Sequence, residues 1–337
     1  MGTMSSTPSK NWLDQYDHTI KHAGLYRRRD RTLFSVEGGD RIRFLHAMTS
    51  NDVQALLPRS KMLASILNPK GKLLADLWIY NLGEKFWIEV NSKALKTVVS
   101  TLEKYILAEN VTVSDLSHQT EILTLLGPKA FEALHKASGV PINDTAQDMV
   151  PFKICNTDCY ITIFRAPLNP TLQIFVPFEN HDVWSAITNV EPGLLQPIEQ
   201  KSFEVLRIEA GIPIYGIDMT EENLLSEIPY LEQGVSYTKG CYIGQETVAR
   251  VHARGGNVAH RLMGVVIEGL NQEILAGTKI FLKEKEVGKI TSSCYSPKLQ
   301  KTLCMALIHR DAFSPGTQVK VFVQEEGYAA EVVSLPV

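Results

Sequence analysis

Three apolar segments separated only by short turns form the clearest pattern in the chain. Residues 61–68, 73–80 and 86–90 are predicted strands, and the turns between them cover residues 69–72 and 81–84. Turns this short join antiparallel strands, because a parallel crossover needs a dozen or more residues. The pattern therefore predicts an antiparallel meander.

An amphipathic helix is predicted directly after the meander. Apolar residues recur at helical spacing between Ser92 and Leu107, and Ser92 is the expected N-cap. The same spacing predicts helices at residues 12–25, 43–48, 130–137, 181–187 and 200–210, and one that begins at Gly244 and ends before Gly255.

Two other groups of strands indicate further folding units. Residues 118–190 combine strands at 121–126, 159–164 and 172–176 with two of the helices, which is typical of a small α+β domain. After Gly256 the chain reads as short strands with glycines between them, and this predicts a small barrel or sandwich. These strands are expected at residues 262–267, 279–282, 287–293, 302–308, 318–322 and 329–333.

The composition limits the possible functions. The 337 residues carry a net charge of −3, which gives no global attraction to nucleic acid or to an anionic membrane. The five cysteines are scattered and odd in number, so we expect no disulfide framework and a reducing, cytoplasmic location. Cys155 and Cys159 have no second Cys or His pair nearby, so no metal site is expected. No apolar run approaches the roughly 18 residues of a membrane span.

The candidate reactive group is the thiol of Cys241, in the segment from Tyr237 to Glu246. Lys239 lies two residues earlier, and an ammonium beside a thiol lowers the pKa of that thiol. The predicted helix after Gly244 places Cys241 at or just before a helix N-terminus, which also favours a thiolate. The alternative is a tight turn whose cysteine is a small buried hydrophobe, which is the commoner use of a free cysteine.

Three charged features need an explanation. Asp76 lies between apolar residues on a predicted central strand, where a carboxylate needs a partner or a ligand unless it faces solvent. Glu209 lies near the C-terminus of its helix, against the dipole, so we expect either a compensating donor, for instance on a ligand, or solvation. The basic run from Arg27 to Arg31 is expected to be a solvated connector, although such a run can also bind phosphate or nucleic acid.

The YgfZ family has a motif that resembles the run Lys239-Gly240-Cys241-Tyr242-x-Gly244-Gln245-Glu246. Its members are folate-binding proteins related to the T-protein (aminomethyltransferase) of the glycine cleavage system. The resemblance extends over nearly the whole chain beyond about residue 25, through the segments Phe44–His46 with Thr49–Val53, Asn68–Lys72, Arg207–Pro213, Ser292–Pro297 and Gly316-Thr317.

The resemblance implies an α+β fold: a three-domain, T-protein-like cloverleaf with antiparallel sheets. A tail and helix would cover residues 1–24. A folate-binding domain would be split between residues 25–117 and 191–260, with a ferredoxin-like insertion at 118–190. Residues 261–337 would form a C-terminal β-barrel.

The resemblance also implies tetrahydrofolate, or a one-carbon derivative, in a central hole. Glu209 matches the acidic residue that hydrogen-bonds the pterin ring, and a carboxylate can accept both N–H groups of a 2-amino-pyrimidinone edge. The other expected cofactor contacts are Asn51, Asp52, Tyr242, Gln245, Glu246 and Arg250.

The chain departs from the T-protein pattern in the second strand of the first hairpin. T-proteins have two adjacent acidic residues there, whereas this chain has Ala75-Asp76. We interpret the lost position as the catalytic one. Asp76 cannot simply replace it, because successive strand side chains point to opposite faces. This favours Cys241, rather than the carboxylate, as the functional residue.

Two hypotheses follow. The leading one is a folate-binding accessory protein for the assembly or maintenance of iron–sulfur proteins, with an indirect effect on tRNA modification. Cys241, with Lys239 beside it, would be a redox-active thiol or a transient ligand. An iron–sulfur cluster normally needs four protein ligands, so a partner protein or a second chain would supply the others.

The alternative is a folate-dependent aminomethyltransferase or demethylase in which Asp76 is the acid–base group. Direct nucleic-acid binding through the run Arg27–Arg31 is not favoured at this net charge.

Overall fold

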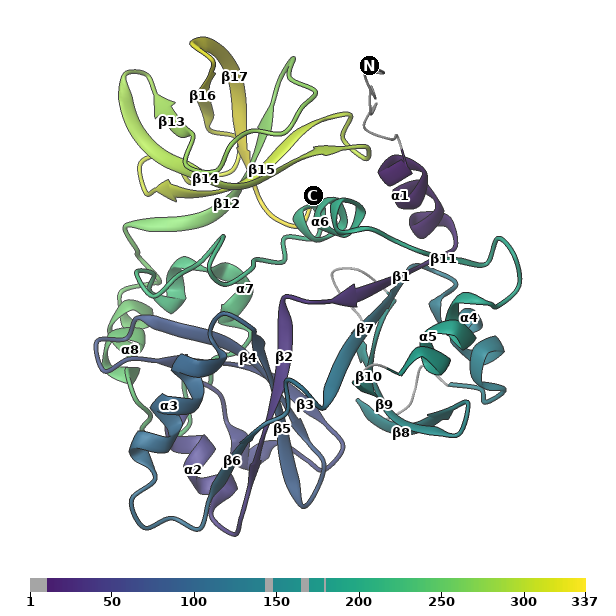
Figure 1. Cartoon of the computed structure of the whole chain (residues 1–337). Coiled ribbons are helices and arrows are strands. Elements are labelled where there is room, and N and C mark those ends of the chain that lie inside the picture. Colours follow the sequence, from purple (N-terminus) through teal and green to yellow (C-terminus); the bar gives the residue numbers. More distant parts are fainter. Residues whose placement is uncertain (1–10, 143–147, 165–169, 179) are drawn as a thin grey trace, which may run out of the picture.

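The structure, a computed structural model, describes residues 11–142, 148–164, 170–178 and 180–337 (Figure 1). These residues form two open sheets and a closed barrel, and helix α6 (Gln200–Glu209) lies between the barrel and the open sheets. The predicted α+β class with antiparallel sheets and a C-terminal barrel is confirmed. The expected tail at residues 1–10 lies outside the described residues.

The first open sheet contains the predicted meander, which is confirmed. Its strand order is β3-β4-β5-β2-β6, and all neighbouring strands are antiparallel. The strands are β2 (Arg31–Glu37), β3 (Lys61–Leu67), β4 (Leu73–Asn81), β5 (Lys85–Asn91) and β6 (Thr112–Asp115).

Two helices, α2 (Arg41–Met48) and α3 (Leu95–Tyr105), pack their apolar side chains against this sheet. A 3₁₀ turn, Val53–Ala55, follows α2. The expected N-cap at Ser92 is wrong: α3 begins three residues later, and the N–H of Ser92 donates to the carbonyl of Asp30 at 2.8 Å. This backbone hydrogen bond links the β5–α3 connection to the β1–β2 turn.

The second open sheet has the order β11-β1-β7-β10-β9-β8. It contains β1 (Ala23–Arg28), β7 (Thr120–Leu126), β8 (Met149–Ile154), β9 (Thr157–Phe164), β10 (Thr171–Pro177) and β11 (Leu195–Pro197). The helices α4 (Ala130–Ser138) and α5 (His181–Thr188) cover it.

The first helix is shorter than predicted. Helix α1 ends at Lys21, and the expected helical residues Ala23 and Leu25 belong to β1, with fully buried side chains. β1 pairs with β7 on one side and with β11 on the other, so this sheet extends beyond residues 118–190. Partners about a hundred or more positions away therefore override the local apolar spacing.

The barrel closes in the order β12-β15-β14-β13-β16-β17. Its strands are β12 (His260–Ile267), β13 (Lys279–Leu282), β14 (Lys285–Ser296), β15 (Lys301–His309), β16 (Gln318–Val323) and β17 (Glu326–Val333). The sequence pattern was compatible with either a barrel or a sandwich. The structure shows a closed barrel, which leaves no free sheet edge.

Helix α6 joins the three parts through one apolar core. Phe203, Leu206 and Ile208 pack in the same cluster as Leu303 and Met305 of the barrel. The remaining helices are short: a 3₁₀ turn at Leu225–Glu227, α7 (Pro229–Glu232) and α8 (Gln245–Ala253). Within the described ranges, no helix combines the length and the apolar character needed to cross a bilayer.

Candidate functional site: a charged cavity between the sheets

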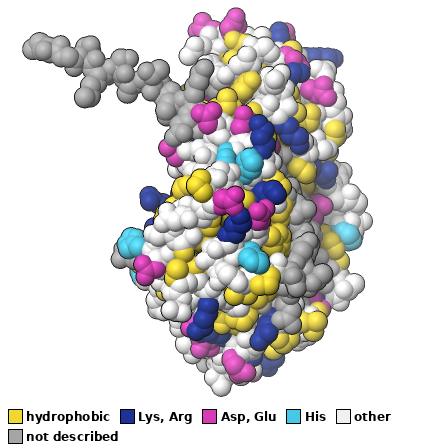
Figure 2. Space-filling view, turned by 90° about the vertical axis from the view of Figure 1, so that its right-hand side faces the viewer, with side chains coloured by type: hydrophobic (Ala, Val, Ile, Leu, Met, Phe, Trp, Pro, Cys, Tyr) yellow, Lys and Arg dark blue, Asp and Glu magenta, His cyan; other side chains and the backbone are white. Residues whose placement is uncertain are grey.

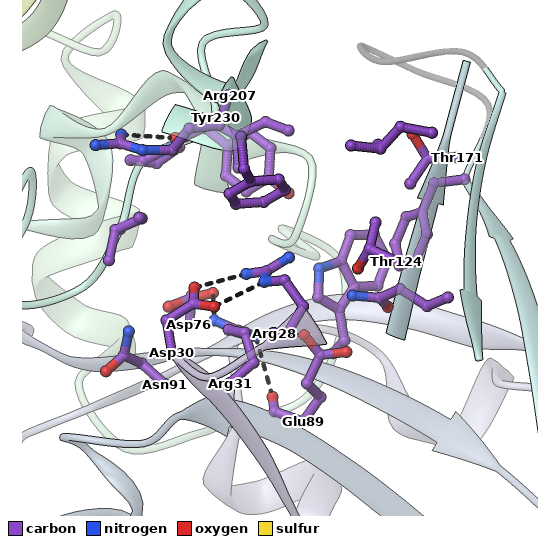
Figure 3. A pocket seen from close by; sticks show the side chains of 18 residues that line it. Arg28, Asp30, Arg31, Asp76, Glu89, Asn91, Thr124, Thr171, Arg207 and Tyr230 are labelled. Atoms are coloured by element: carbon purple, nitrogen blue, oxygen red, sulfur yellow. Dashed lines mark hydrogen bonds and ion pairs between the residues drawn. The ribbon is translucent and has the colours of Figure 1, made fainter. Parts of the chain in front are cut away.

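A cavity of about 770 Å³, measured out to its open mouth, lies where the two open sheets face α6 (Figure 3). The β1–β2 segment, β4 and β5 supply most of its charged side chains. Strands β7, β9 and β10 form another wall, and α6, residues 212–214 and α7 close the opposite side.

Arg31 is the centre of the charged wall. Its Nη1 donates to Oδ2 of Asp76 at 2.6 Å, and its Nε donates to Oε1 of Glu89 at 2.8 Å. All three side chains are more than nine-tenths buried. Burial alone would lower the pKa of Arg31, but the two carboxylates raise it above its ordinary value. Arg31 is therefore charged and ion-paired to both carboxylates.

Asp76 and Thr124 each present a buried oxygen without a partner. Among the residues that the structure describes, Oδ1 of Asp76 and Oγ1 of Thr124 have no hydrogen-bond partner, and both side chains line the cavity (Figure 3). An unsatisfied buried polar group costs about 1–3 kcal/mol. The cavity is therefore suited to a ligand that brings N–H or O–H donors to these two oxygens.

Arg28 and Asp30 form a second charged pair in the same wall. Nε and Nη2 of Arg28 donate to the two oxygens of Asp30, each at 2.7 Å. Burial would raise the pKa of Asp30, but the Arg28 guanidinium outweighs burial and lowers it below the ordinary value. The guanidinium also lies 5.0 Å from the ring centre of Phe203, which stacks on Tyr26 at 4.2 Å.

The expectation that residues Arg27–Arg31 form a solvated connector is wrong for Arg28 and Arg31. Their side chains are 14% and 8% exposed, and both line the cavity. The partners of Arg31 lie 45 and 58 residues away in sequence, so the run alone could not reveal them. On the face drawn in Figure 2, basic and acidic side chains of the described residues are interspersed, with no continuous basic stripe.

The opposite wall of the cavity contains Arg207 and Tyr230 (Figure 3). Nη1 of Arg207 donates to Oδ2 of Asp218 at 2.8 Å, Nη2 donates to Oγ of Ser292 at 2.8 Å, and Nε donates to Oε2 of Glu204 at 2.7 Å. Burial, with a smaller contribution from the Asp76 charge, raises the pKa of Tyr230 to about 12. Tyr230 is therefore a neutral hydroxyl at physiological pH.

Asp76 is the cavity-facing member of the Ala75-Asp76 pair. Ala75 is fully buried in the apolar core under α2 and α3, so its side chain points away from the cavity. The position at which this chain lacks a carboxylate therefore faces the core. Our interpretation that the lost position was the one beside the ligand is not supported by this geometry, because the retained carboxylate faces the cavity.

Glu209 lies outside the cavity. Its Oε2 accepts a hydrogen bond from the Tyr16 hydroxyl at 2.8 Å, and its Oε1 accepts one from Oγ of Ser296 at 2.5 Å. The side chain is buried, so solvation does not compensate it, and the two donors come from α1 and β14 rather than from a ligand. Glu209 borders a separate groove between α1, α6 and the C-terminal segment.

Lys239 fixes the motif loop to the end of α2. Its Nζ donates to the backbone carbonyls of Thr49 at 2.7 Å, Asn51 at 3.0 Å and His46. Burial lowers the pKa of Lys239 to about 8, although Asp52 acts in the opposite direction. Its three protons are engaged by carbonyl oxygens, which is an anchoring role rather than the thiol activation that the sequence suggested.

Cys241 is exposed, so the alternative of a buried hydrophobic cysteine is wrong. Helix α8 begins at Gln245, after an N-cap at Gly244 with a φ of 82°. Cys241 therefore lies three residues before the N-cap, farther from the helix N-terminus than predicted. It does not line the central cavity.

The other predicted cofactor contacts also lie away from the cavity. The Nδ2 of Asn51 donates to the carbonyl of Leu63 at 2.8 Å, and Glu246 forms an ion pair with Arg250 on the exposed face of α8. Of the predicted site residues, the structure brings only Asp76 into the cavity. Those outside its lining are Asn51, Asp52, Glu209, Lys239, Cys241, Tyr242, Gln245, Glu246 and Arg250.

The sequence contained one unused signal for the cavity. Glu89 lies between apolar residues on a predicted strand, as Asp76 does, and the same argument about a buried carboxylate applied to it. The sequence contained no such signal for Arg31, because its neighbours in the run Arg27–Arg31 are also charged and it does not stand out among apolar residues.

Comparisons with known proteins give the family. Residues 6–230 match the GCVT N-terminal domain, and residues 260–337 match the glycine cleavage T-protein C-terminal barrel domain. The chain is 25% identical over 336 residues to an aminomethyltransferase of Shouchella clausii, covering 95% of this chain and 88% of that protein. It is 27% identical over 286 residues to one of Thermus thermophilus, covering 84% and 78%.

A solved structure supports the fold. The crystal structure of the glycine cleavage system aminomethyltransferase T from Bartonella henselae superposes with a TM-score of 0.85 at 23% identity, covering 96% of this chain and 89% of that one. The chain thus belongs to the GCVT family of T-protein-like proteins. Aminomethyltransferases of this family use tetrahydrofolate, in agreement with the predicted cofactor.

Proposed function

We propose that this chain is a tetrahydrofolate-binding protein of the YgfZ type and that the cavity between its two open sheets binds the pterin ring. The observation that carries the proposal is the unpartnered Oδ1 of Asp76, buried and facing the cavity. A pterin presents a 2-amino group and a ring N–H side by side, which are the donors that this carboxylate oxygen lacks.

The rest of the cavity suits the same ligand. Trp78 and Phe164 meet edge to face at 4.8 Å and provide aromatic surface for a flat ring. The hydroxyl of Thr124 adds a polar contact. Glu209 is not our choice for the pterin contact, because both of its oxygens already accept hydrogen bonds from Tyr16 and Ser296.

The proposed accessory role in iron–sulfur protein assembly or maintenance rests on Cys241. Its thiol is exposed and lies outside the cavity, where a partner protein can reach it. In the described part of the chain, no three His, Cys, Asp or Glu side chains are grouped to hold a metal ion. A cluster handled here would therefore take its remaining ligands from the partner. The effect on tRNA modification would be indirect, and the five free thiols fit a reducing cytoplasm.

Calorimetric titration with tetrahydrofolate under anaerobic conditions tests the binding site. We expect micromolar binding to the wild type and a loss of about tenfold or more in Asp76→Asn, which replaces an acceptor oxygen and weakens the Arg31 pair. Glu209→Gln is the matched control and is expected to bind as the wild type does. Equal binding by Asp76→Asn and the wild type would reject this site.

A complementation experiment tests the accessory role separately. A deletion strain that carries Cys241→Ser is expected to show low activity of iron–sulfur enzymes, although the variant still binds folate. Full complementation by Cys241→Ser would remove the thiol from the mechanism.

An aminomethyltransferase or demethylase remains the second candidate, because Asp76 places a carboxylate with one free oxygen in the cavity. The Arg31 ion pair argues against it, since Asp76 would have to leave that pair to protonate a ligand nitrogen. Turnover of an aminomethyl or N-methyl donor with tetrahydrofolate, lost in Asp76→Asn, would favour the enzyme over the accessory protein.

A further inference from the structure

One face of the first open sheet carries a buried polar network that ends at Asp76. Asp76 and Tyr80 lie on β4 an even number of residues apart, so their side chains point to the same face. Glu89 of β5 is paired in register with Trp78, midway between them, and shares that face. With Arg31 of β2, these side chains are more than nine-tenths buried and hydrogen-bonded to one another.

Glu89 holds Arg31 through two separate contacts. Nε of Arg31 donates to Oε1 of Glu89 at 2.8 Å, and Nη2 donates to the backbone carbonyl of the same residue at 3.3 Å. Nη1 is left for Asp76, and it donates to Oδ2 at 2.6 Å. A guanidinium commonly pairs with a carboxylate through two parallel hydrogen bonds, one to each oxygen. The contacts to Glu89 restrict Arg31 to one of them, which explains why Oδ1 of Asp76 accepts no hydrogen bond from the described residues.

Tyr80 fixes Glu89 in turn. Its hydroxyl donates to Oε2 of Glu89 at 2.7 Å and also lies 3.2 Å from Oε1 of Gln173 on β10. Burial, reinforced by the Glu89 charge, raises the pKa of Tyr80 well above its ordinary value, so the hydroxyl keeps its proton at physiological pH and can donate it. Both carboxylate oxygens of Glu89 are therefore held, one by Tyr80 and the other by Arg31.

We propose that Glu89, held by Tyr80, is a positioning residue of the cavity: it keeps Arg31 on a single oxygen of Asp76 and so leaves Oδ1 for the ligand. A binding side chain keeps its geometry when hydrogen bonds from a supporting layer of residues fix it. Without Glu89, the guanidinium of Arg31 can turn to both oxygens of Asp76, and one of its N–H groups then competes with the ligand for Oδ1. The inference rests on the proposed function, since it assumes that the ligand donates to this oxygen.

Calorimetric titration with tetrahydrofolate tests this role with two substitutions. Glu89→Met removes the side-chain acceptor of Arg31, and we expect about tenfold weaker binding. Tyr80→Phe removes one hydroxyl that lies outside the cavity lining, and we expect about threefold weaker binding. Tyr16→Phe is the matched control, because its hydroxyl also donates to a buried glutamate, Glu209, away from the cavity. This control is expected to bind as the wild type does.

A double substitution separates positioning from a general loss of structure. The lysine ammonium is a point charge without the fork of a guanidinium, so it cannot pair in parallel with both oxygens of Asp76. Adding Arg31→Lys to Glu89→Met should therefore tighten binding by about threefold or more relative to Glu89→Met alone. Losses in Arg31→Lys and Glu89→Met that simply multiply in the double variant would contradict the positioning role, because a purely structural glutamate gives that result.

Wild-type affinity in Glu89→Met overturns the inference. If Glu89→Met does not fold, the two tyrosine variants decide: weaker binding by Tyr80→Phe alone supports the inference, and equal binding by Tyr80→Phe and Tyr16→Phe overturns it. These results leave tetrahydrofolate binding at Asp76 intact. Failure of the proposed function differs from them, because the wild type then does not bind or Asp76→Asn binds equally well, and the inference is rejected with it.

Discussion

At the scale of single residues, the cavity is defined by which charges are satisfied and which are not. Arg31 neutralises one oxygen of Asp76 and leaves the other free, and this asymmetry turns a structural ion pair into a hydrogen-bond acceptor for a ligand. In Glu209, by contrast, each oxygen already accepts a hydrogen bond from a side chain of the protein. An oxygen that accepts no hydrogen bond therefore distinguishes Asp76 from Glu209.

The Arg28–Asp30 pair makes the free energy of unfolding depend on pH in the acidic range. Because the folded pKa of Asp30 is lower than its unfolded pKa, its contribution is present above the ordinary pKa near 3.9 and is lost as the pH falls through the folded value. Urea unfolding at pH 7 should show a loss of about 2 kcal/mol in Asp30→Asn. Between pH 5 and 3 the variant should lose less stability than the wild type. Parallel pH curves for the two proteins would contradict this role of Asp30.

Lys239 provides a test of the anchoring role. Lys239→Met removes three hydrogen bonds to carbonyl oxygens at the end of α2, and we expect a loss of about 1–3 kcal/mol in the free energy of unfolding. Lys70→Met, at an exposed turn position, is the control and should stay within about 0.5 kcal/mol of the wild type. Equal stability of Lys239→Met and the wild type would leave the ammonium available for another role.

At the scale of elements, helix α6 connects the cavity to the barrel. The side chain of Arg207 lines the cavity and donates hydrogen bonds to Asp218 and Ser292. The hydroxyls of Thr291 and Ser292, both on β14, each donate to Oδ1 of Asp218 at 2.6 Å. The side chain of Asp218 is completely buried, so this network depends on the Arg207 charge.

Removal of Arg207 should weaken the contact between α6 and the barrel and so lower the free energy of unfolding. Arg207→Met leaves the buried Asp218 without its cation, and we expect a loss of about 3–5 kcal/mol by urea denaturation. Adding Asp218→Asn should recover part of that loss, whereas Glu204→Gln, at a partner with 28% exposure, should cost less than about 1 kcal/mol. Additive losses in Arg207→Met and Asp218→Asn would show that the two residues are independent.

The sequence predicted the elements whose signals are local. The meander has short turns and apolar strands, and the barrel strands have glycines between them, so both were found. Strand β1 was missed because its partners β7 and β11 lie about a hundred or more residues away. β8 was missed although Cys155 and Asn156, with φ values of 47° and 62°, form a tight turn before β9.

The same limit applies to the site. Asp76 was found because a carboxylate within an apolar strand stands out in the sequence. The folding of the chain, and no local pattern, pairs Arg31 with that carboxylate and brings Arg28 into the same cavity. The motif around Cys241 was conspicuous, yet its lysine anchors a loop and its cysteine faces solvent away from the cavity.

At the scale of the whole molecule, the cavity walls come from both open sheets and from α6, which also packs against the barrel (Figure 1). A ligand bound there contacts parts that are far apart in sequence. At a free ligand concentration one hundred times the dissociation constant, binding would add about 2.7 kcal/mol to the free energy of unfolding.

Hydrogen exchange tests this coupling. With saturating tetrahydrofolate, amides of β4, β7 and α6 should all gain protection, because each element supplies part of the wall. Helix α4, which lies on the core of the second sheet away from the cavity lining, is the internal reference. Protection confined to α8 and the Cys241 loop would place the ligand elsewhere.

The most direct test of the central claim is a crystal structure of the tetrahydrofolate complex. The account predicts the pterin ring in the cavity, with N–H groups at hydrogen-bond distance from Oδ1 of Asp76 and the Arg31–Asp76 pair intact. A pterin bound in the groove beside Glu209, or at the Lys239–Glu246 loop, would contradict it.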